Sequence, residues 1–144
     1  MKFHSQFFSL VFCLLLASFF GCGKNVSMGG KVTFSDDNSP LTVGTVCFAT
    51  DTFYARGKLD ASGNYTLGFD QPGNGLPKGE YKVYIADATV PTGSYKTDDG
   101  EEMAIYSPVI AEKYTTKGAT DLKVTVDGST RTFDFKVDRA SAKK

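Results

Sequence analysis

The sequence predicts an all-β domain of the sandwich class. From about residue 31 onward, short runs of β-branched and aromatic residues are separated by Gly, Pro, Asn and Asp at the intervals typical of a β-sandwich. Within these runs apolar and polar residues alternate, as they do in strands that bury one face. No segment of this region predicts a helix of ordinary length, so we expect packed sheets without helical layers.

An apolar run over residues 7–20 precedes the domain and follows a short basic start. This order is that of an export signal, and about 14 residues are too few for a membrane span, which needs roughly 20. The run ends in Phe19-Phe20-Gly21-Cys22, which resembles the lipobox of bacterial lipoproteins. The Gly-Cys pair fits that pattern, whereas the two phenylalanines replace its aliphatic and small residues. An ordinary signal peptide or a buried apolar helix is the alternative.

The lipobox resemblance implies that Cys22 is lipidated, that residues 1–21 are removed, and that acyl chains such as palmitate anchor the new amino terminus. Two or three chains anchor a protein stably, at about 0.8 kcal/mol per buried methylene. Gly23 follows the cysteine in place of an inner-membrane retention aspartate. The resemblance therefore favours the outer membrane of the cell envelope, with the domain in the periplasm or at the cell surface.

The mature chain would carry 15 basic and 16 acidic side chains and no histidine, because Lys2 and His4 leave with the signal. Without a basic excess, nucleic acid is excluded as a partner. Without histidine, the chain lacks a Ser-His-Asp or Cys-His pair and the commonest zinc ligand. We therefore expect no enzyme activity, no catalytic residues and no cofactor. Cys47 remains as the single thiol, and its strand-like context predicts a packed side chain.

The first part of the mature chain predicts a tether followed by two strands. Residues 22–30 are glycine-rich and polar, which is typical of a flexible spacer. Strands are expected at residues 31–34 and 42–49. In the second of these, strict alternation directs Cys47 away from the core, unless a bulge at Gly44 shifts the pattern.

Two hairpins are predicted from turn chemistry. Residues 53–59 and 64–69 flank Asp60-Ala61-Ser62-Gly63, in which the aspartate can accept local backbone N–H bonds and Gly63 can take a positive φ. Residues 121–126 and 130–137 flank a similar Asp-Gly-Ser turn. Another strand is expected at 80–88, after a glycine-rich break at 71–79 that lacks the ending of a phosphate-binding loop. The predicted core residues are Val32, Phe34, Val46, Phe48, Tyr65, Leu67, Phe69, Tyr81, Val83, Ile85, Leu122, Val124, Val126, Phe133, Phe135 and Val137.

The segment from residue 89 to residue 120 is expected to be irregular, and long loops of this kind are often functional. It contains Asp98, Asp99, Glu101 and Glu102, which are the weak candidates for a metal site. Their spacing does not match a helix-loop-helix calcium site, so we favour a solvated loop tip.

Several short motifs resemble the transthyretin-like, or carboxypeptidase-regulatory-like, domain of bacterial lipoproteins. The resemblance implies a seven-stranded antiparallel Greek-key β-sandwich, of the prealbumin-like or Ig-like kind, that serves as a non-catalytic accessory. The enzyme members of that family use histidines, which the mature chain would lack. The expected organisation is a signal peptide at 1–21, a tether at 22–30, the sandwich domain at 31–139 and a frayed tail at 140–144. The motifs are Gly30-Lys31-Val32-Thr33-Phe34, Gly44-Thr45-Val46-Cys47-Phe48, Gly57 to Leu67, Gly75 to Val83, Ile110 to Tyr114, Asp121 to Val126 and Phe133 to Phe135.

These observations favour a lipid-anchored, non-enzymatic module of the cell envelope that binds a protein or a glycan or serves structurally. Two alternatives stay open. A histidine-free hydrolase would need two carboxylates about 5–10 Å apart in a cleft. A carbohydrate-binding module would need a flat row of exposed aromatic rings. The candidate rings are Phe53, Tyr54, Tyr84, Tyr95 and Tyr106.

Lipidation at Cys22 can be tested directly. Cys22→Ser should leave an unprocessed precursor and abolish labelling of the protein by a fatty-acid probe in cells, because the lipoprotein resemblance implies that modification of the Cys22 thiol precedes cleavage and acylation of the new amino terminus. Absence of label on the wild type, or equal labelling of the serine variant, would contradict the lipoprotein interpretation.

Overall fold

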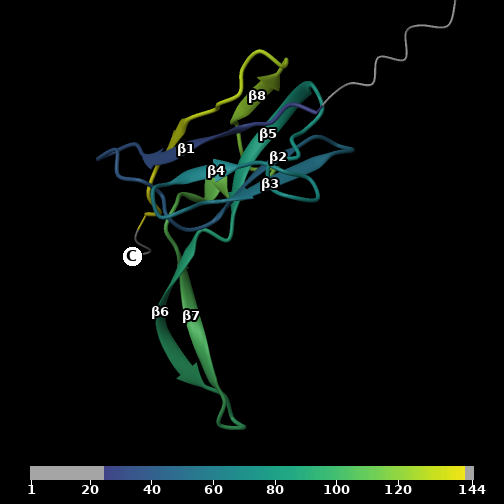
Figure 1. Cartoon of the computed structure of the whole chain (residues 1–144). Helices are drawn as coiled ribbons and strands as arrows, with labels where there is room; N and C mark the ends of the chain where they lie inside the picture. The colour runs from purple at the N-terminus through teal and green to yellow at the C-terminus, as the bar shows by residue number, and fades with distance from the viewer. Residues whose placement is uncertain (1–24, 142–144) are drawn as a thin grey trace, which may run out of the picture.

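Residues 25–141, the part of the chain that the computed structural model describes, fold almost entirely into β-strands (Figure 1). Cys22, the predicted signal and residues 142–144 lie outside the described residues. No helix between residues 25 and 141 is long and apolar enough to cross a membrane. The elements are β1 (Gly29–Phe34), β2 (Thr45–Ala49), β3 (Tyr54–Lys58), β4 (Asn64–Thr66), β5 (Gly79–Ala86), β6 (Thr89–Lys96), β7 (Glu102–Pro108), the 3-10 turn η1 (Glu112–Tyr114), β8 (Lys123–Val126) and β9 (Phe135–Val137).

Seven of these strands form the two sheets of a sandwich, in the orders β4-β1-β9 and β3-β2-β5-β8. The predicted fold class, an all-β sandwich, is confirmed. One pairing departs from the antiparallel expectation, because β9 runs parallel to β1. The backbone of Gly29, at the start of β1, bonds to Arg131 and to Phe133. The segment between β8 and β9 therefore meets the amino end of β1, and β9 then runs beside β1 in the same direction.

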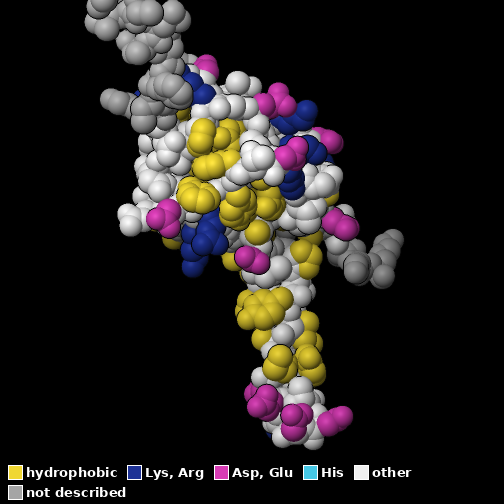
Figure 2. All heavy atoms as spheres, turned by 90° about the vertical axis from the view of Figure 1, so that its right-hand side faces the viewer, with side chains coloured by type: hydrophobic (Ala, Val, Ile, Leu, Met, Phe, Trp, Pro, Cys, Tyr) yellow, Lys and Arg dark blue, Asp and Glu magenta, His cyan; other side chains and the backbone are white. Residues whose placement is uncertain are grey.

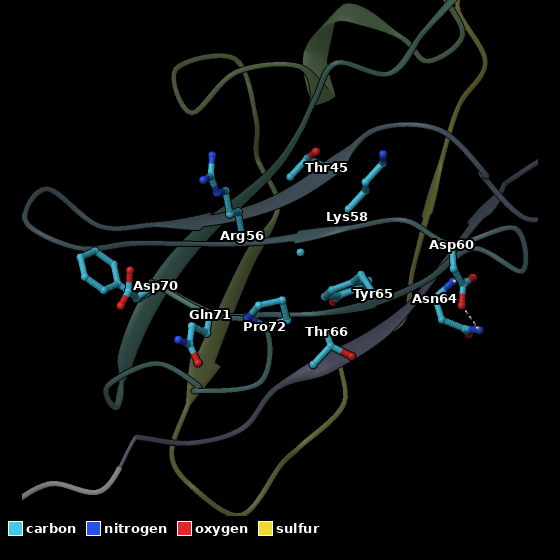
Figure 3. Close-up of a pocket in the computed structure, with 13 residues that line it drawn as sticks. Thr45, Arg56, Lys58, Asp60, Asn64, Tyr65, Thr66, Asp70, Gln71 and Pro72 are labelled. Atoms are coloured by element: carbon cyan, nitrogen blue, oxygen red, sulfur yellow. Dashed lines mark hydrogen bonds between the residues drawn. The ribbon is translucent and has the colours of Figure 1, made fainter.

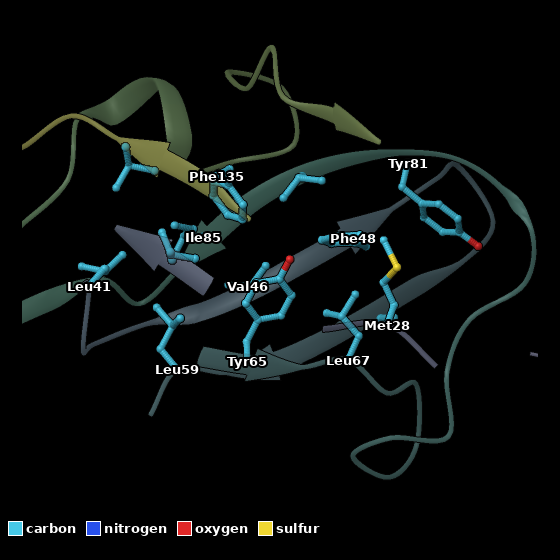
Figure 4. Packing of buried hydrophobic residues seen from close by; sticks show 14 of the residues in the cluster. Met28, Leu41, Val46, Phe48, Leu59, Tyr65, Leu67, Tyr81, Ile85 and Phe135 are labelled. Carbon is cyan, nitrogen blue, oxygen red and sulfur yellow. The ribbon is translucent and has the colours of Figure 1, made fainter. Parts of the chain in front are cut away.

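The core lies between the two sheets and is centred on Phe48 of β2 (Figure 4). The centroid of its ring is 6.2 Å from that of Tyr65 and 6.0 Å from that of Phe133, both of which belong to the opposite half of the sandwich. The Tyr65 hydroxyl donates to the Phe133 carbonyl oxygen at 2.6 Å, so the buried phenol keeps a partner. The predicted alternation is confirmed for β1, β2 and β5, whose core residues are Val32, Phe34, Val46, Phe48, Tyr81, Val83 and Ile85.

The loop at Asp60 forms as predicted, and the segments that flank it keep the antiparallel register of the predicted hairpin. The Asp60 carboxylate accepts the backbone N–H groups of Ser62 and Asn64 at 2.8 and 2.9 Å, and Gly63 has a φ of 78°. Farther along, Arg56 and Gly68 exchange two backbone hydrogen bonds of 3.0 Å, and a Cβ on Gly57 would collide with the Thr66 carbonyl, so the two backbones lie close together. The continuous ladders of these strands are with other partners, because β3 pairs with β2 and β4 pairs with β1.

The second predicted hairpin is wrong, because its two strands belong to different sheets and do not pair with each other. The Asp127 carboxylate caps the turn by accepting the backbone N–H of Ser129 at 2.8 Å, and Gly128 has a φ of 93°. Beyond the turn, β8 adds to β5 in one sheet and β9 adds to β1 in the other. The apolar faces of both strands still contribute to the core, because Val126 of one sheet and Phe135 of the other are both buried. The alternating pattern alone does not distinguish these two arrangements.

The domain begins earlier than residue 31, so part of the predicted tether belongs to the fold. The backbones of Val26 and Leu76 exchange two hydrogen bonds of 2.8 and 3.0 Å. Val26 and Met28 are both buried in the core. Of the predicted frayed tail, Ala140 is held by a hydrogen bond from its N–H to the Val109 carbonyl.

The segment from 89 to 120 is not irregular, which corrects the sequence-based expectation. Its first part is the antiparallel pair β6 and β7, and η1 follows. The segment ends at Thr120, whose buried hydroxyl donates to the Val83 carbonyl at 2.6 Å. This hydrogen bond fixes the end of the segment to β5, next to the position where β8 begins.

A chain that starts at Gly29 should be markedly less stable than one that starts at Asn25. The shorter chain lacks Val26 and Met28, and loss of one large buried side chain typically costs about 2–5 kcal/mol of unfolding free energy. Met28→Leu in the longer chain is the matched control, and it should cost less than about 1.5 kcal/mol because the volume is kept. Equal unfolding curves in urea for the two chain lengths would show that these residues do not belong to the core.

Candidate functional site

The most exposed element of the molecule is the β6–β7 hairpin, which projects away from the sandwich (Figure 1). A kink at Asp87, with a φ of 55°, separates it from β5. Asparagine and aspartate tolerate this left-handed conformation better than most residues. At the base, the Val109 N–H donates to the Ala88 carbonyl at 3.0 Å. Within residues 25–141, no further strand pairs with either edge of the hairpin.

One face of the hairpin gathers most of its large apolar side chains, and the other mixes polar and apolar ones. Tyr95 pairs with Met103, and Gly93 pairs with Ile105, so these side chains share a face. A bulge between Pro91 and Gly93 shifts the register and returns Val90, opposite Ser107, to the same face. We call Val90, Tyr95, Met103 and Ile105 the apolar face; their exposed fractions are 37, 53, 47 and 46%.

The opposite face carries Ser94, Lys96, Ala104 and Glu102, with Tyr106 beside Pro91. Hydrophobic side chains thus run along the hairpin and acidic ones gather at its end (Figure 2). Contiguous exposed apolar surface of this kind is typical of an interaction site. A two-stranded hairpin is only marginally stable by itself in water, so a partner that covers the apolar face would also stabilise the element.

The four acidic candidates, Asp98, Asp99, Glu101 and Glu102, lie at the tip of this hairpin. The turn is closed by the Thr97 N–H, which donates to the Glu101 carbonyl at 2.8 Å. The Glu102 carboxylate accepts the hydroxyl of Ser94 at 2.5 Å. Among residues 25–141, no three acidic, histidine or cysteine side chains converge closely enough to hold a metal ion. The four acidic residues therefore lie near one another in the turn but do not form a metal-binding site.

A second candidate is an open groove of about 550 Å³ on the side of the sandwich where β3 and β4 diverge (Figure 3). Arg56 and Lys58 of β3 lie along one side, and Thr66, Gln71 and Pro72 lie along the other. Gly57 and Gly68 contribute only backbone to its lining. The groove is therefore a consequence of the crossing between β3 and β4.

Both signs of charge line this groove. None of the ion pairs within residues 25–141 involves Arg56 or Lys58. Asp60 and Asp70 lie toward opposite ends. Both oxygens of Asp60 accept hydrogen bonds, and those from the backbone and side chain of Asn64 lower the pKa of its carboxyl group. A glycosidase acid needs a raised pKa, so Asp60 is unsuited to that role.

The predicted aromatic candidates do not form one row. Phe53 is half-buried and packs against Phe69 and Tyr81. Tyr54 and Tyr84 flank Cys47 on the outer face of the four-stranded sheet. Tyr95 and Tyr106 lie on opposite faces of the hairpin.

Cys47 lies on the outer face of β2, as strict alternation predicts, and is nevertheless fully buried. Its sulfur is 3.1 Å from the Tyr54 hydroxyl. Burial raises the pKa of the thiol, which keeps it protonated and unreactive. The prediction of a packed cysteine is confirmed.

Phe69 was predicted as core and is instead 61% exposed in the groove. The strand that carries Tyr65 ends at Thr66, and Gly68 pairs with Arg56, which turns the chain. The Phe69 N–H donates to the Asn74 side-chain oxygen at 2.9 Å, which fixes the new direction. The alternation of apolar and polar residues does not predict this change of direction, because it continues to Phe69, beyond the end of the strand at Thr66.

No sequence model of a known protein family matches the chain, and no curated protein sequence matches it. Solved structures that it resembles include the major pilin subunit BcpA of Bacillus cereus, at 10% identity and a TM-score of 0.43 over 81% of this chain. A variant of the same pilin gives 11% identity and a TM-score of 0.42 over 82% of this chain. A 9R-lipoxygenase from Cyanothece gives 17% identity and a TM-score of 0.35, with 78% of this chain and 16% of the lipoxygenase covered.

The chain spans about 30% of the length of either pilin structure. With TM-scores below 0.5, these likenesses assign neither a family nor an activity to the chain.

Proposed function

We propose that this protein is a lipid-anchored, non-enzymatic binding module of the bacterial cell envelope that docks onto a partner protein through the β6–β7 hairpin. The observation that carries the proposal is the uncovered apolar face, with Tyr95, Met103 and Ile105 about half exposed on a projecting element. Membership of the transthyretin-like family and an outer-membrane location are parts of the same proposal, supported by the sequence motifs.

The direction of the hairpin supports an anchor at Cys22. The first described segment of the chain, which leads into β1, lies at the end of the sandwich remote from the β6–β7 hairpin (Figure 1). Cys22 is only three residues before Asn25, where that segment begins. A lipid at that position would hold the sandwich close to the membrane and direct the hairpin away from it, toward a partner.

The composition of the hairpin indicates the chemistry of the partner. An apolar strip next to a tip with four carboxylates fits a protein surface that has an apolar groove and a basic rim. The acidic tip disfavours a membrane with anionic lipids, because like charges repel there. Tyrosine is enriched among residues that dominate binding energy, and truncation of such a residue commonly costs about 2 kcal/mol or more.

A photo-crosslinking amino acid placed in living cells can test this docking surface. At position 105, on the apolar face, we expect one discrete adduct with a second protein. At position 104, on the opposite face of the same strand, we expect little or none, because neighbouring residues of a strand point to opposite sides. The measurement is the mobility and mass of the adducts after mild irradiation.

The specificity of the adduct is checked with Tyr95→Thr, which keeps strand propensity and removes the ring. This change should reduce crosslinking from position 105 severalfold. Tyr106→Thr on the other face should leave it unchanged. Equal adducts from positions 104 and 105, no adduct at all, or an adduct only with lipid would each overturn the proposal, whereas an adduct with the mass of two copies would identify self-association as the correct function of the face.

A further inference from the structure

We infer that the groove between β3 and β4 is a binding site for a neutral glycan of two to three sugar units. The groove lies on the sandwich and shares no residue with the hairpin. This inference is therefore independent of the protein partner proposed above.

The size and shape of the groove fit such a ligand. Its volume of about 550 Å³ falls within the range of about 300–1,000 Å³ that is usual for small-ligand sites. Polar side chains line both sides of the groove, so a sugar held in it can be contacted from either side. Its lining mixes polar and apolar groups, as the alternating hydroxyl and C–H surfaces of a sugar require.

The polar side chains supply both donors and acceptors. Arg56 and Lys58 donate, Asp70 accepts, and Gln71 and Thr66 can do both. Sugar hydroxyls also donate and accept, so each of these groups can be satisfied by the same ligand. The two cations and the two carboxylates, Asp60 and Asp70, sum to no net charge, which favours a neutral sugar over a phosphate or a uronate.

Phe69 provides the apolar platform. Its ring is exposed within the lining of the groove, and the flat face of an aromatic ring suits the C–H face of a sugar ring. The ring is supported from behind by Phe53, at 5.3 Å between centroids, and its backbone is held by Asn74. A side chain fixed in this way loses little freedom on binding.

Two glycines fix the backbone that lines the groove. A Cβ on Gly57 would collide with the Thr66 carbonyl, and one on Gly68 would collide with the Gln71 carbonyl. Neither position can accept a larger residue without moving the backbone, so at both positions the lining of the groove is backbone alone.

Nuclear magnetic resonance of the full-length chain tests this inference, with the protein held in a detergent that has no sugar head group. The probes are cellotriose, laminaritriose, maltotriose, chitotriose and the acidic trigalacturonate, each titrated at millimolar concentration. We expect at least one neutral trisaccharide to shift the backbone amide signals of Gly57, Thr66, Gly68 and Phe69 in a saturable way. The amide signals of the hairpin should not move.

Phe69→Ala should weaken binding at least about tenfold, which corresponds to about 1.4 kcal/mol. Tyr106→Ala is the matched control, because both rings are 61% exposed, and it should leave the affinity unchanged. Gln71→Ala is a second variant at an exposed position and should also weaken binding. The inference is overturned if no neutral trisaccharide shifts the groove signals, if only trigalacturonate does, or if Phe69→Ala and Gln71→Ala both bind as the wild type does. None of these results depends on the hairpin partner.

Discussion

The packing of two sheets around Phe48 constrains almost every other part of the sandwich. Its ring meets Tyr65 and Phe133 from the facing side and Tyr81 from its own sheet. To bring those rings together, the chain passes between the two sheets four times, after β1, β3, β4 and β8. The passage after β3 brings the backbone of Gly57 against that of Thr66, and both residues line the groove. The core, the topology and one candidate site thus share a single geometric cause.

Local chemistry in the sequence was sufficient to predict the strands of the sandwich and their turns. The alternation of Tyr81, Val83 and Ile85 and the capping aspartates at positions 60 and 127 all have physical effects within a few residues. Strand pairing was not predictable in the same way. A strand with one apolar face has the same alternating sequence whether it pairs with the next strand along the chain or packs against that strand from the facing sheet. For the same reason, Val26 and Met28 gave no sign that they belong to the core.

The candidate sites were less visible than the fold. Asp-Gly at positions 99 and 100, between Tyr95 and Ile105, is a hairpin signal, but Pro91 and Pro108 interrupt the flanking runs and conceal the strands. The groove had no local signal, since Arg56 and Gln71 meet only after the chain has folded. The single histidine, His4, lies in the predicted signal, so the sequence offered no histidine-based site in the predicted domain. A surface that binds without doing chemistry need not carry a recognisable motif.

We propose that the sandwich is rigid and that the apolar face of the hairpin is buried only when a partner protein binds it. The most direct measurement of this difference is amide hydrogen exchange by mass spectrometry, on the full-length chain purified in detergent and on the same chain in the envelope membranes where we propose that it resides. The account predicts fast exchange over residues 89–108 in the purified chain and clear slowing of that segment in the envelope, while β2 and β5 stay slow in both. A hairpin that is already protected in the purified chain, or one that exchanges equally fast in the envelope, would contradict the claim that its apolar face is a docking surface.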